Sequence, residues 1–245
     1  MTRQYLSSLT AKPRTQAANL HLGIILAIVA GALNAGGYLA INQYTSHMTG
    51  MVSMFADQLV LGNFDLVTVA AGSWLAFVMG AACTAAMVSY GNRRDHSHVF
   101  ARPLLLEAVL ILIFGSIGGT LEQRELAEVS LAVILLCFTM GLQNALITKV
   151  SRAEIRTTHI TGLTTDLGIE LGKLFYWNRT NRDAMHPAIL ANRDKLRIHF
   201  LLIGAFLLGG IAGAMGFKYL GFVSAIPLAL ALALISLANQ RQHDS

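Results

Sequence analysis

Long apolar stretches alternate along the chain with short connectors that carry most of the charged residues. Six stretches approach the length of about 20 residues that a helix needs to cross the hydrocarbon core of a bilayer. They are Leu20–Ile41, Val67–Tyr90, Leu104–Thr120, Val129–Thr148, Ile198–Phe217 and Leu220–Leu237. The last two adjoin each other around Lys218-Tyr219, which predicts a tight helical hairpin. The pattern therefore predicts an all-α integral membrane protein with six transmembrane helices.

Two further apolar stretches, Met51–Leu61 and Leu163–Phe175, are too short to span a bilayer upright. At ~1.5 Å per residue each covers roughly 16–20 Å, against ~30 Å for the hydrocarbon core. Each is a re-entrant half-helix, a helix lying in the interface or a short tilted span.

The distribution of basic residues favours the arrangement in which neither short stretch crosses. With the N-terminus inside, all of the 18 basic residues except Arg124 and Lys218 then lie on the inner side. If both stretches crossed, the basic connectors Gly91–Arg102 and Lys149–Arg156 would move outside. Because cytoplasmic loops carry the excess of lysine and arginine, we expect six spans and cytoplasmic termini. The apolar stretch after the basic N-terminal tail also resembles a secretory signal peptide, although the repeat described below requires this stretch to be retained.

Composition supports a lipid environment and excludes a soluble domain. Hydrophobic residues make up 54% of the chain and charged residues 13%, and the mean hydropathy is +0.56. An ordinary soluble domain has about 25% charged residues. The net charge of +5 is a topology signal, because the chain lacks the aromatic-rich basic patches of nucleic-acid-binding proteins. Cys83 and Cys137 lie inside apolar stretches and are expected to be packing residues.

Two passages of the sequence match each other. Gly31-Ala-Leu-Asn34-Ala35 resembles Gly141-Leu-Gln-Asn144-Ala145 at an offset of 110, and Thr45-Ser-His47-Met-Thr49-Gly50 resembles Thr157-Thr-His159-Ile-Thr161-Gly162 at 112. Phe77-Val-Met-Gly80 similarly resembles Phe206-Leu-Leu-Gly209. With three spans per half, the halves enter the membrane in opposite orientations, which is an inverted-topology repeat.

This repeat divides the chain into five parts. They are a cytoplasmic tail (1–19), a first repeat (20–120) with a short helix at 50–62, an acidic outer loop (121–128), a second repeat (129–238) with a short helix at 162–175, and a cytoplasmic tail (239–245).

The matched polar residues are the candidate substrate-binding site. Each threonine of a Thr-Gly pair is expected to cap a short helix, whose free N–H groups suit an anionic ligand. The glycines permit close approach of a helix or ligand, the histidines could bind substrate or relay protons, and the asparagines could bond across helices. Each also has a purely structural interpretation. The candidates are Asn34, His47, Thr49, Gly50, Asn144, His159, Thr161, Gly162 and Asp166.

Carboxylates near the membrane are candidates for coupling to an ion or proton. Asp57 lies in the first short stretch, while Asp166 and Glu170 share one face of the second. Two carboxylates there would repel each other, so one is expected to have a raised pKa or to share a cation or proton. The alternative is a solvated cytoplasmic face. Glu107 lies near the inner end of the third span, where a carboxylate is costly and marks a pathway or a partnered charge.

No motif of a hydrolase, metalloprotease or P-loop enzyme occurs in the chain, so we expect neither an enzyme nor a metal or other cofactor. The leading hypothesis is a small secondary transporter or channel-like carrier for a small molecule or ion, with its site between the two Thr-Gly helix starts. The alternative is a membrane scaffold or sensor that does not transport. The expected partner is the lipid bilayer, nucleic acid is not expected, and a homo-oligomer is compatible with the sequence.

The sequence resembles the YoaK family (DUF1275) of bacterial membrane proteins. The resemblance rests on Asn34-Ala35 with Thr49-Gly50, and on the more specific stretch from Arg156 through His159-Ile-Thr161-Gly162 to Asp166-Leu-Gly168. Family members typically have Asp at the position of Asn34 and Asn at that of Met51. The resemblance implies a multi-span helical protein of the bacterial inner membrane. It implies no particular substrate or activity.

Overall fold

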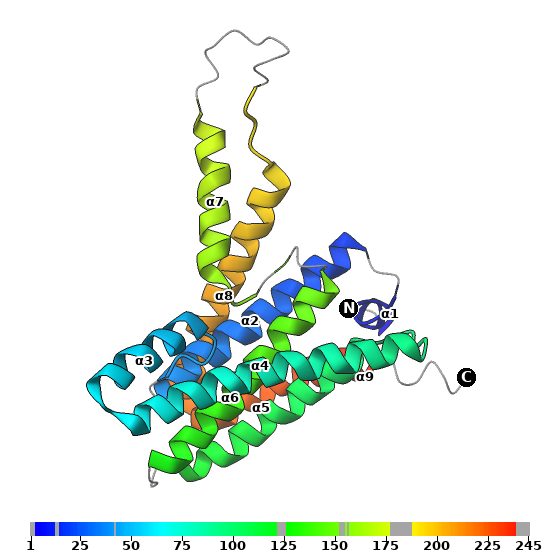
Figure 1. Cartoon of the computed structure of the whole chain (residues 1–245). Helices are drawn as coiled ribbons and strands as arrows, with labels where there is room; N and C mark the ends of the chain where they lie inside the picture. Colours follow the sequence, from blue (N-terminus) through cyan, green and yellow to red (C-terminus); the bar gives the residue numbers. More distant parts are fainter. Residues whose placement is uncertain are drawn as a thin grey trace.

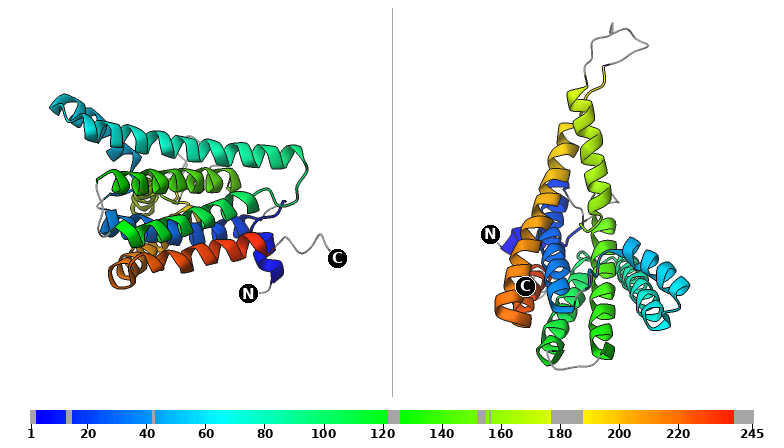
Figure 2. Two further views of the ribbon diagram at one scale, coloured as in Figure 1. Left: turned by 90° about the horizontal axis from the view of Figure 1, so that it is seen from below. Right: turned by 90° about the vertical axis from the view of Figure 1, so that its left-hand side faces the viewer.

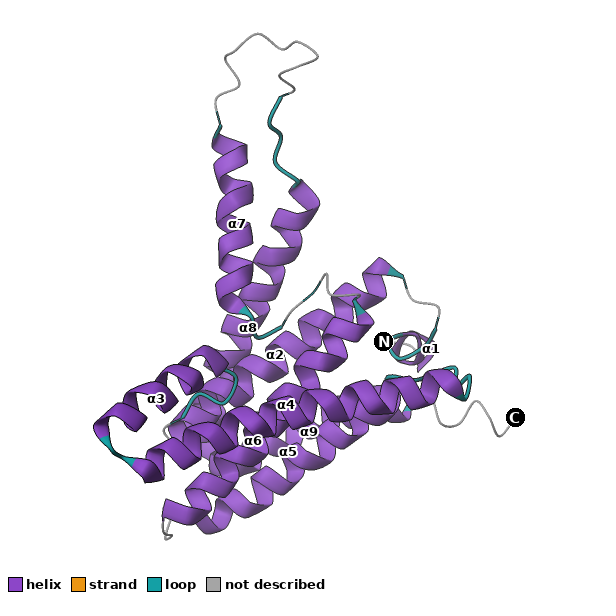
Figure 3. Cartoon of the chain, viewed as in Figure 1, coloured by secondary structure: helices purple, strands orange, loops and turns teal. Residues whose placement is uncertain are grey.

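The computed structural model describes residues 3–12, 15–41, 43–121, 126–151, 155, 157–176 and 188–238. These residues form helices and loops, without a strand among them (Figure 3). The helices are α1 (Arg3–Ser8), α2 (Gln16–Ile41), α3 (Met48–Leu61), α4 (Phe64–Arg93), α5 (Ala101–Leu121), α6 (Leu126–Val150), α7 (Ile160–Phe175), α8 (Arg193–Leu220) and α9 (Ala225–Leu237), with a 3-10 turn η1 (Gly221–Ser224) before α9.

Each of the eight predicted helical stretches corresponds to a helix, which confirms the all-helical fold. The predicted N-terminal tail (1–19) differs, because it contains α1 and the first turn of α2. Half of the predicted acidic outer loop (122–125), the C-terminal tail (239–245) and several basic residues used to predict the orientation lie outside the described residues, while 126–128 belong to α6.

Helices α2, α4, α5, α6 and α9 run side by side along one direction (Figure 2, left). Helix α8 packs along α2, and its first half pairs with α7 in a hairpin that stands away from the other helices (Figure 1). Helix α3 turns back along the first half of α4. Gly62 permits this reversal, because its φ of 74° is left-handed and its N–H closes the end of α3.

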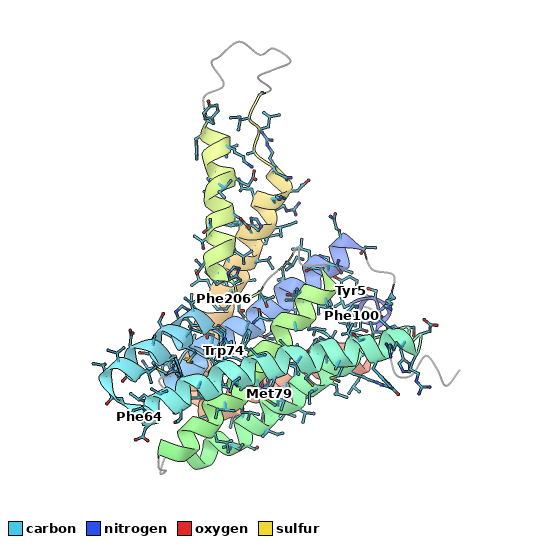
Figure 4. All side chains as sticks on the ribbon, in the orientation of Figure 1. Tyr5, Phe64, Trp74, Met79, Phe100 and Phe206 are labelled. Carbon is cyan, nitrogen blue, oxygen red and sulfur yellow. The ribbon has the colours of Figure 1, made fainter. Side chains whose placement is uncertain are left out.

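Helices α2 and α8 cross with backbone against backbone. A Cβ atom added at Gly31 would overlap the carbonyl oxygen of Phe206, and one added at Gly209 would overlap that of Ile28. Phe206 lies where the α7–α8 hairpin joins the bundle (Figure 4). Only glycine allows helices to approach this closely, because any side chain would strike main-chain atoms that cannot rotate away.

Helices α4 and α6 cross in the same manner. A Cβ at Gly80 would overlap the carbonyl oxygen of Phe138, and one at Gly141 would overlap that of Phe77. These four positions match those of the α2–α8 crossing at offsets of 110 for α2 and α6 and 129 for α4 and α8. Each crossing therefore joins one helix from each half of the chain, through corresponding residues.

Aromatic side chains fill the core where α5, α8 and η1 meet. The ring centroids of Phe114, Phe217 and Phe222 lie 5.5–6.1 Å apart in tilted or edge-on contacts. Such contacts are favourable beyond the apolar area that they bury. Gly36 of α2 closes this cluster, because a Cβ there would overlap the ring of Phe217. The tight helical hairpin predicted around Lys218-Tyr219 is not formed, because α8 packs along α2, α9 packs along α5, and η1 joins the two.

The exterior of the bundle is apolar. On α4, Phe64, Trp74 and Met79 expose between 45% and 67% of their surface (Figure 4). Four helical segments among the described residues are long and apolar enough to cross a membrane: Gln16–Leu39, Phe64–Arg93, Leu131–Val150 and Arg193–Leu237. The last combines α8, η1 and α9, which the sequence pattern divides into two spans, and α5 is not among the four, so the count of six spans stays a prediction.

Candidate functional site

The connector between α2 and α3 is tied to α2 by Asn34. Its side-chain oxygen accepts hydrogen bonds from the Ser46 hydroxyl at 2.9 Å and the Ser46 backbone N–H at 3.2 Å. The asparagine therefore acts within its own half of the chain and fixes the residues that lead into α3. We call Asn34, Thr45, Ser46, His47 and Gly50 the first connector cluster.

The connector between α6 and α7 is held in the corresponding way. The side-chain oxygen of Asn144 accepts from the Thr158 hydroxyl at 2.6 Å, while its NH2 group donates to the carbonyl of Met140 at 2.9 Å. The two asparagines thus bind connectors, in place of the bonds between spans that the sequence suggested. We call Asn144, Thr157, Thr158, His159 and Gly162 the second connector cluster.

The prediction that Thr49 and Thr161 cap the short helices is wrong. The N-cap residues are His47 and His159, with φ,ψ of −90°,70° and −84°,57°, and neither makes a side-chain capping bond. Helical geometry already begins at Met48 and Ile160, so each threonine lies inside the first turn. A side chain there cannot reach back over the free N–H groups as an N-cap residue does. Both threonines are exposed.

Each histidine packs over the glycine of its own motif. A Cβ at Gly50 would overlap the imidazole of His47, and one at Gly162 would overlap that of His159. The group that approaches these glycines closely is therefore the histidine ring, where the sequence suggested another helix or a ligand. Neither histidine supplies a side-chain cap, so these rings do not bond the first N–H groups of α3 and α7 as an N-cap residue would.

Two threonines that sequence reasoning did not select are buried just before these helix starts. Thr45 and Thr157 are both 0% exposed, and their hydroxyl oxygens have no hydrogen-bond partner among the residues that the structure describes. They are equivalent at the offset of 112. A buried hydroxyl without a partner is costly, so its occurrence at the same point of both halves calls for an explanation. The signal lay in the matched motifs, which both begin with these residues.

The acidic candidates separate into exposed and bonded groups. Asp57 and Asp166 are exposed. Glu170 is buried, and it accepts hydrogen bonds from Lys173 Nζ at 2.8 Å and the Asn192 backbone N–H at 2.6 Å. The bond from Lys173, followed by that from Asn192, lowers the pKa of Glu170. The expected raised pKa is therefore not found at Glu170, because a lysine and a backbone amide stabilise its charge.

Glu170 ties the end of α7 to the start of α8, and this tie should depend on pH. Because the folded protein lowers the pKa of Glu170, the stabilisation is present above its ordinary pKa and is lost as the pH falls through the folded value. We expect Glu170→Gln to accelerate amide hydrogen exchange over residues 192–196 near neutral pH, and the difference from the wild type to disappear as the pH falls through the lowered pKa of Glu170. The exposed Asp166→Asn is the control and should change nothing. Equal exchange in both variants and the wild type would contradict the tie.

A groove of about 600 Å³ lies between α5, η1 and α9, away from both connector clusters. Its walls are mostly apolar, with side chains such as Leu112, Phe222 and Ile226, and none of the predicted site residues lines it. Such a surface suits a lipid chain better than a polar solute. The groove therefore does not bear on the predicted site.

Comparison with known proteins places the chain in a family. The family described as "Protein of unknown function (DUF1275)" matches residues 22–238. The chain belongs to this family. The UPF0700 transmembrane protein YoaK of Bacillus subtilis (strain 168) is 23% identical to it over 186 residues, which cover 75% of this chain and 79% of the relative. No solved structure matches the chain significantly.

The resemblance seen in the sequence is thereby confirmed. This DUF1275 member is a membrane protein with transmembrane helices, as the transmembrane relative and the four long apolar segments indicate. The family description states no activity for its members. Functional assignment must therefore come from the connector clusters themselves.

Proposed function

We propose that this protein is a small secondary transporter or channel-like carrier for a small anionic solute, with its site at the starts of α3 and α7. The observation that carries this proposal is the pair of buried hydroxyls of Thr45 and Thr157 beside those helix starts, neither of which has a hydrogen-bond partner among the described residues. A solute that accepts hydrogen bonds from these hydroxyls and from free helix N–H groups would satisfy both.

The proposed architecture is a pair of repeats with inverted topology, with six spans and both termini in the cytoplasm of a bacterial inner membrane. Two contacts between α2 and α6 support the inversion. Gln143 Nε2 donates to the Leu26 carbonyl at 2.5 Å, and a Cβ at Gly37 would lie 3.2 Å from Leu136. Residue numbers rise along α2 as they fall along α6, so these equivalent helices run antiparallel, as an inverted repeat requires.

In this architecture α3 and α7 are half-helices that begin inside the bundle. Helix α3 has 14 residues and turns back along α4 at Gly62. Because both helices rise ~1.5 Å per residue, its first turn lies roughly level with Phe77 of the α4–α6 crossing. The partial positive charge of a helix N-terminus at that depth attracts an anion, and the low dielectric strengthens the attraction.

The alternative is a scaffold or sensor that does not transport, and one observation favours it. Asn34 and Asn144 are already bonded to connectors, and Gly50 and Gly162 are covered by histidine rings. Most of the matched residues therefore make structural contacts that require no ligand. In a carrier the hydroxyls of Thr45 and Thr157 bind the solute, so that removing one lowers the flux. In a scaffold or sensor they bind no transported solute.

Replacing Thr157 with valine tests this difference, because valine keeps the shape of threonine and removes only the hydroxyl. Purified protein in liposomes would be screened for uptake of chloride, nitrate, formate, acetate and phosphate. A hydrogen bond to a charged ligand contributes about 1.5–3 kcal/mol, so Thr157→Val should lower the flux roughly 10- to 100-fold. Its thermal stability should not fall, because an unpartnered buried group is removed.

Thr164→Val, an exposed substitution on α7, is the matched control and should leave both flux and stability unchanged. Wild-type flux no greater than that of empty vesicles for every anion would exclude the carrier within this panel. If Thr157→Val transports an anion as fast as the wild type, the Thr157 hydroxyl is not part of the binding site.

A further inference from the structure

Helix α5 holds a carboxyl group that the proposed site does not use. Glu107 is 0% exposed, and neither of its carboxylate oxygens has a hydrogen-bond partner among the described residues. It lies six residues after Ala101, the first residue of α5, which is about 9 Å along the helix. Leu104, Ala108 and Ile111 of the same helix are buried with it.

The helices around Glu107 provide no countercharge in the core. Helix α5 packs against α9, α6, η1 and the end of α4, and α2 contributes to the same core. Neither α9 nor η1 contains an ionisable residue. On the described parts of α2, α4 and α6 the ionisable side chains are exposed, apart from two cysteines: His21 and Tyr38 on α2, Asp65, Cys83, Tyr90 and Arg93 on α4, and Cys137 and Lys149 on α6. Helix α8 reaches this core through Phe217, and its ionisable side chains are exposed except for His199, which is buried near the start of the helix. Arg102 of α5 is also exposed.

An ionised carboxylate cannot persist in these surroundings. A buried charge without a partner carries a large desolvation penalty, which neither a hydrogen bond nor a described cation offsets here. Binding a metal cation would require several further oxygen ligands, and the described residues contain no group of three acidic, histidine or cysteine side chains that could hold one. A single proton neutralises the carboxylate without any further ligand.

A purely structural role does not explain why the carboxyl is there. A neutral carboxylic acid still needs an acceptor for its O–H, and without one an apolar residue of similar size would be more favourable at this position. A carboxyl group inside a membrane protein marks an ion or proton pathway or a partnered charge, and Glu107 has no partner among the described residues.

We propose that Glu107 is the proton-binding group of the carrier. It is the neutral acid in the closed arrangement seen here, and it releases and regains one proton when α5 separates from its neighbours during the transport cycle. The O–H bond breaks, the proton passes to water at the nearer, basic end of α5, and the carboxylate is reprotonated from water before the core closes again. This role rests on the proposed function and identifies its coupling ion.

Infrared spectroscopy of the full-length protein in lipid vesicles tests the protonation without any solute. Near neutral pH the wild type should show the C=O stretch of a protonated carboxyl group, shifted in deuterated water and absent from Glu107→Gln. Glu107→Asp, which keeps an acid, should retain such a band. A wild-type spectrum without a band that Glu107→Gln removes would overturn the proposal, whatever the transport assays show.

Coupling is tested in the same vesicles with a pH-sensitive dye in the lumen and the anion panel used above. The wild type should acidify or alkalinise the lumen as the anion moves. Glu107→Gln should carry the anion down its own gradient while the accompanying pH change falls at least tenfold, and Glu107→Asp should restore it. A pH change that Glu107→Gln leaves intact would overturn the coupling role. If the wild type transports no anion, the proposed carrier function and the coupling role of Glu107 are both contradicted. The infrared band then still decides, independently, whether Glu107 is protonated.

Discussion

Replacing Gly209 with alanine is expected to destabilise the protein sharply, because the added methyl group would overlap the Ile28 carbonyl at the α2–α8 crossing. Main-chain atoms cannot rotate aside, so the two helices must separate. Overpacking of this kind costs about 1–3 kcal/mol, and more where the backbone has to move. The measurement is the melting temperature of the purified protein in detergent.

Gly204→Ala is the matched control, since it lies on the same helix and an added Cβ would meet nothing within 4 Å. Alanine is the better helix former by roughly 0.5–1 kcal/mol, so this variant should be as stable as the wild type or slightly more stable. Gly80→Ala, at the equivalent α4–α6 crossing, should resemble Gly209→Ala. Equal melting of the Gly204 and Gly209 variants would mean that α2 and α8 do not approach as described.

Single cysteines at equivalent ends of the two halves should react from opposite sides of the membrane. Phe64 and Arg193 are the first residues of α4 and α8, matched at the offset of 129, and both are exposed. In intact cells a membrane-impermeant maleimide should label Phe64→Cys but not Arg193→Cys, which should become reactive only after permeabilisation. The effect is all or none, because the bilayer blocks the charged reagent.

Ser97→Cys and Tyr219→Cys extend this test to the connectors on either side. The proposed orientation places Ser97 inside and Tyr219 outside, and the native Cys83 and Cys137 supply the background measured in the wild type. Labelling of Phe64→Cys and Arg193→Cys from the same face would exclude the inverted repeat. Labelling of Ser97→Cys in intact cells would reverse the orientation.

The lengths of the apolar stretches were enough to predict the helices, because a segment in the hydrocarbon core must bond its backbone N–H and C=O groups internally, as a helix does. The reversal after α3 also follows from a local signal, Gly62-Asn63 between two apolar stretches. The helix starts were predicted less well. The Thr-Gly pairs predict N-caps at Thr49 and Thr161, yet the N-caps lie two residues earlier, and the N-cap preference for threonine is outweighed by the position that Asn34 and Asn144 impose on the connectors.

The inner face of α5 could not be predicted from the sequence. Apart from Glu107, Ser116 and Thr120, this helix is apolar beyond its first turn, so the sequence does not show which side faces the core. Only packing against α6 and α9 reveals that the carboxyl group is buried, where a solvated position near the membrane surface was equally compatible with the sequence. That Thr45 and Thr157 lack a hydrogen-bond partner in the part of the chain that the structure describes likewise depends on tertiary contacts that no local pattern contains.

The pairing of α2 with α8 and of α4 with α6 has a consequence for how the protein is made. As the ribosome proceeds, α2 is the first of the long helices to emerge, but α8, which packs against its glycine residues, is almost the last to be synthesised. The first half on its own therefore lacks α6 and α8, the helices that pack against α4 and α2. Gly31 and Gly80 at these crossings face lipid or an insertion chaperone until the second half is synthesised. Neither half should fold when expressed alone, whereas co-expression of two fragments divided within residues 122–125 supplies both missing partners.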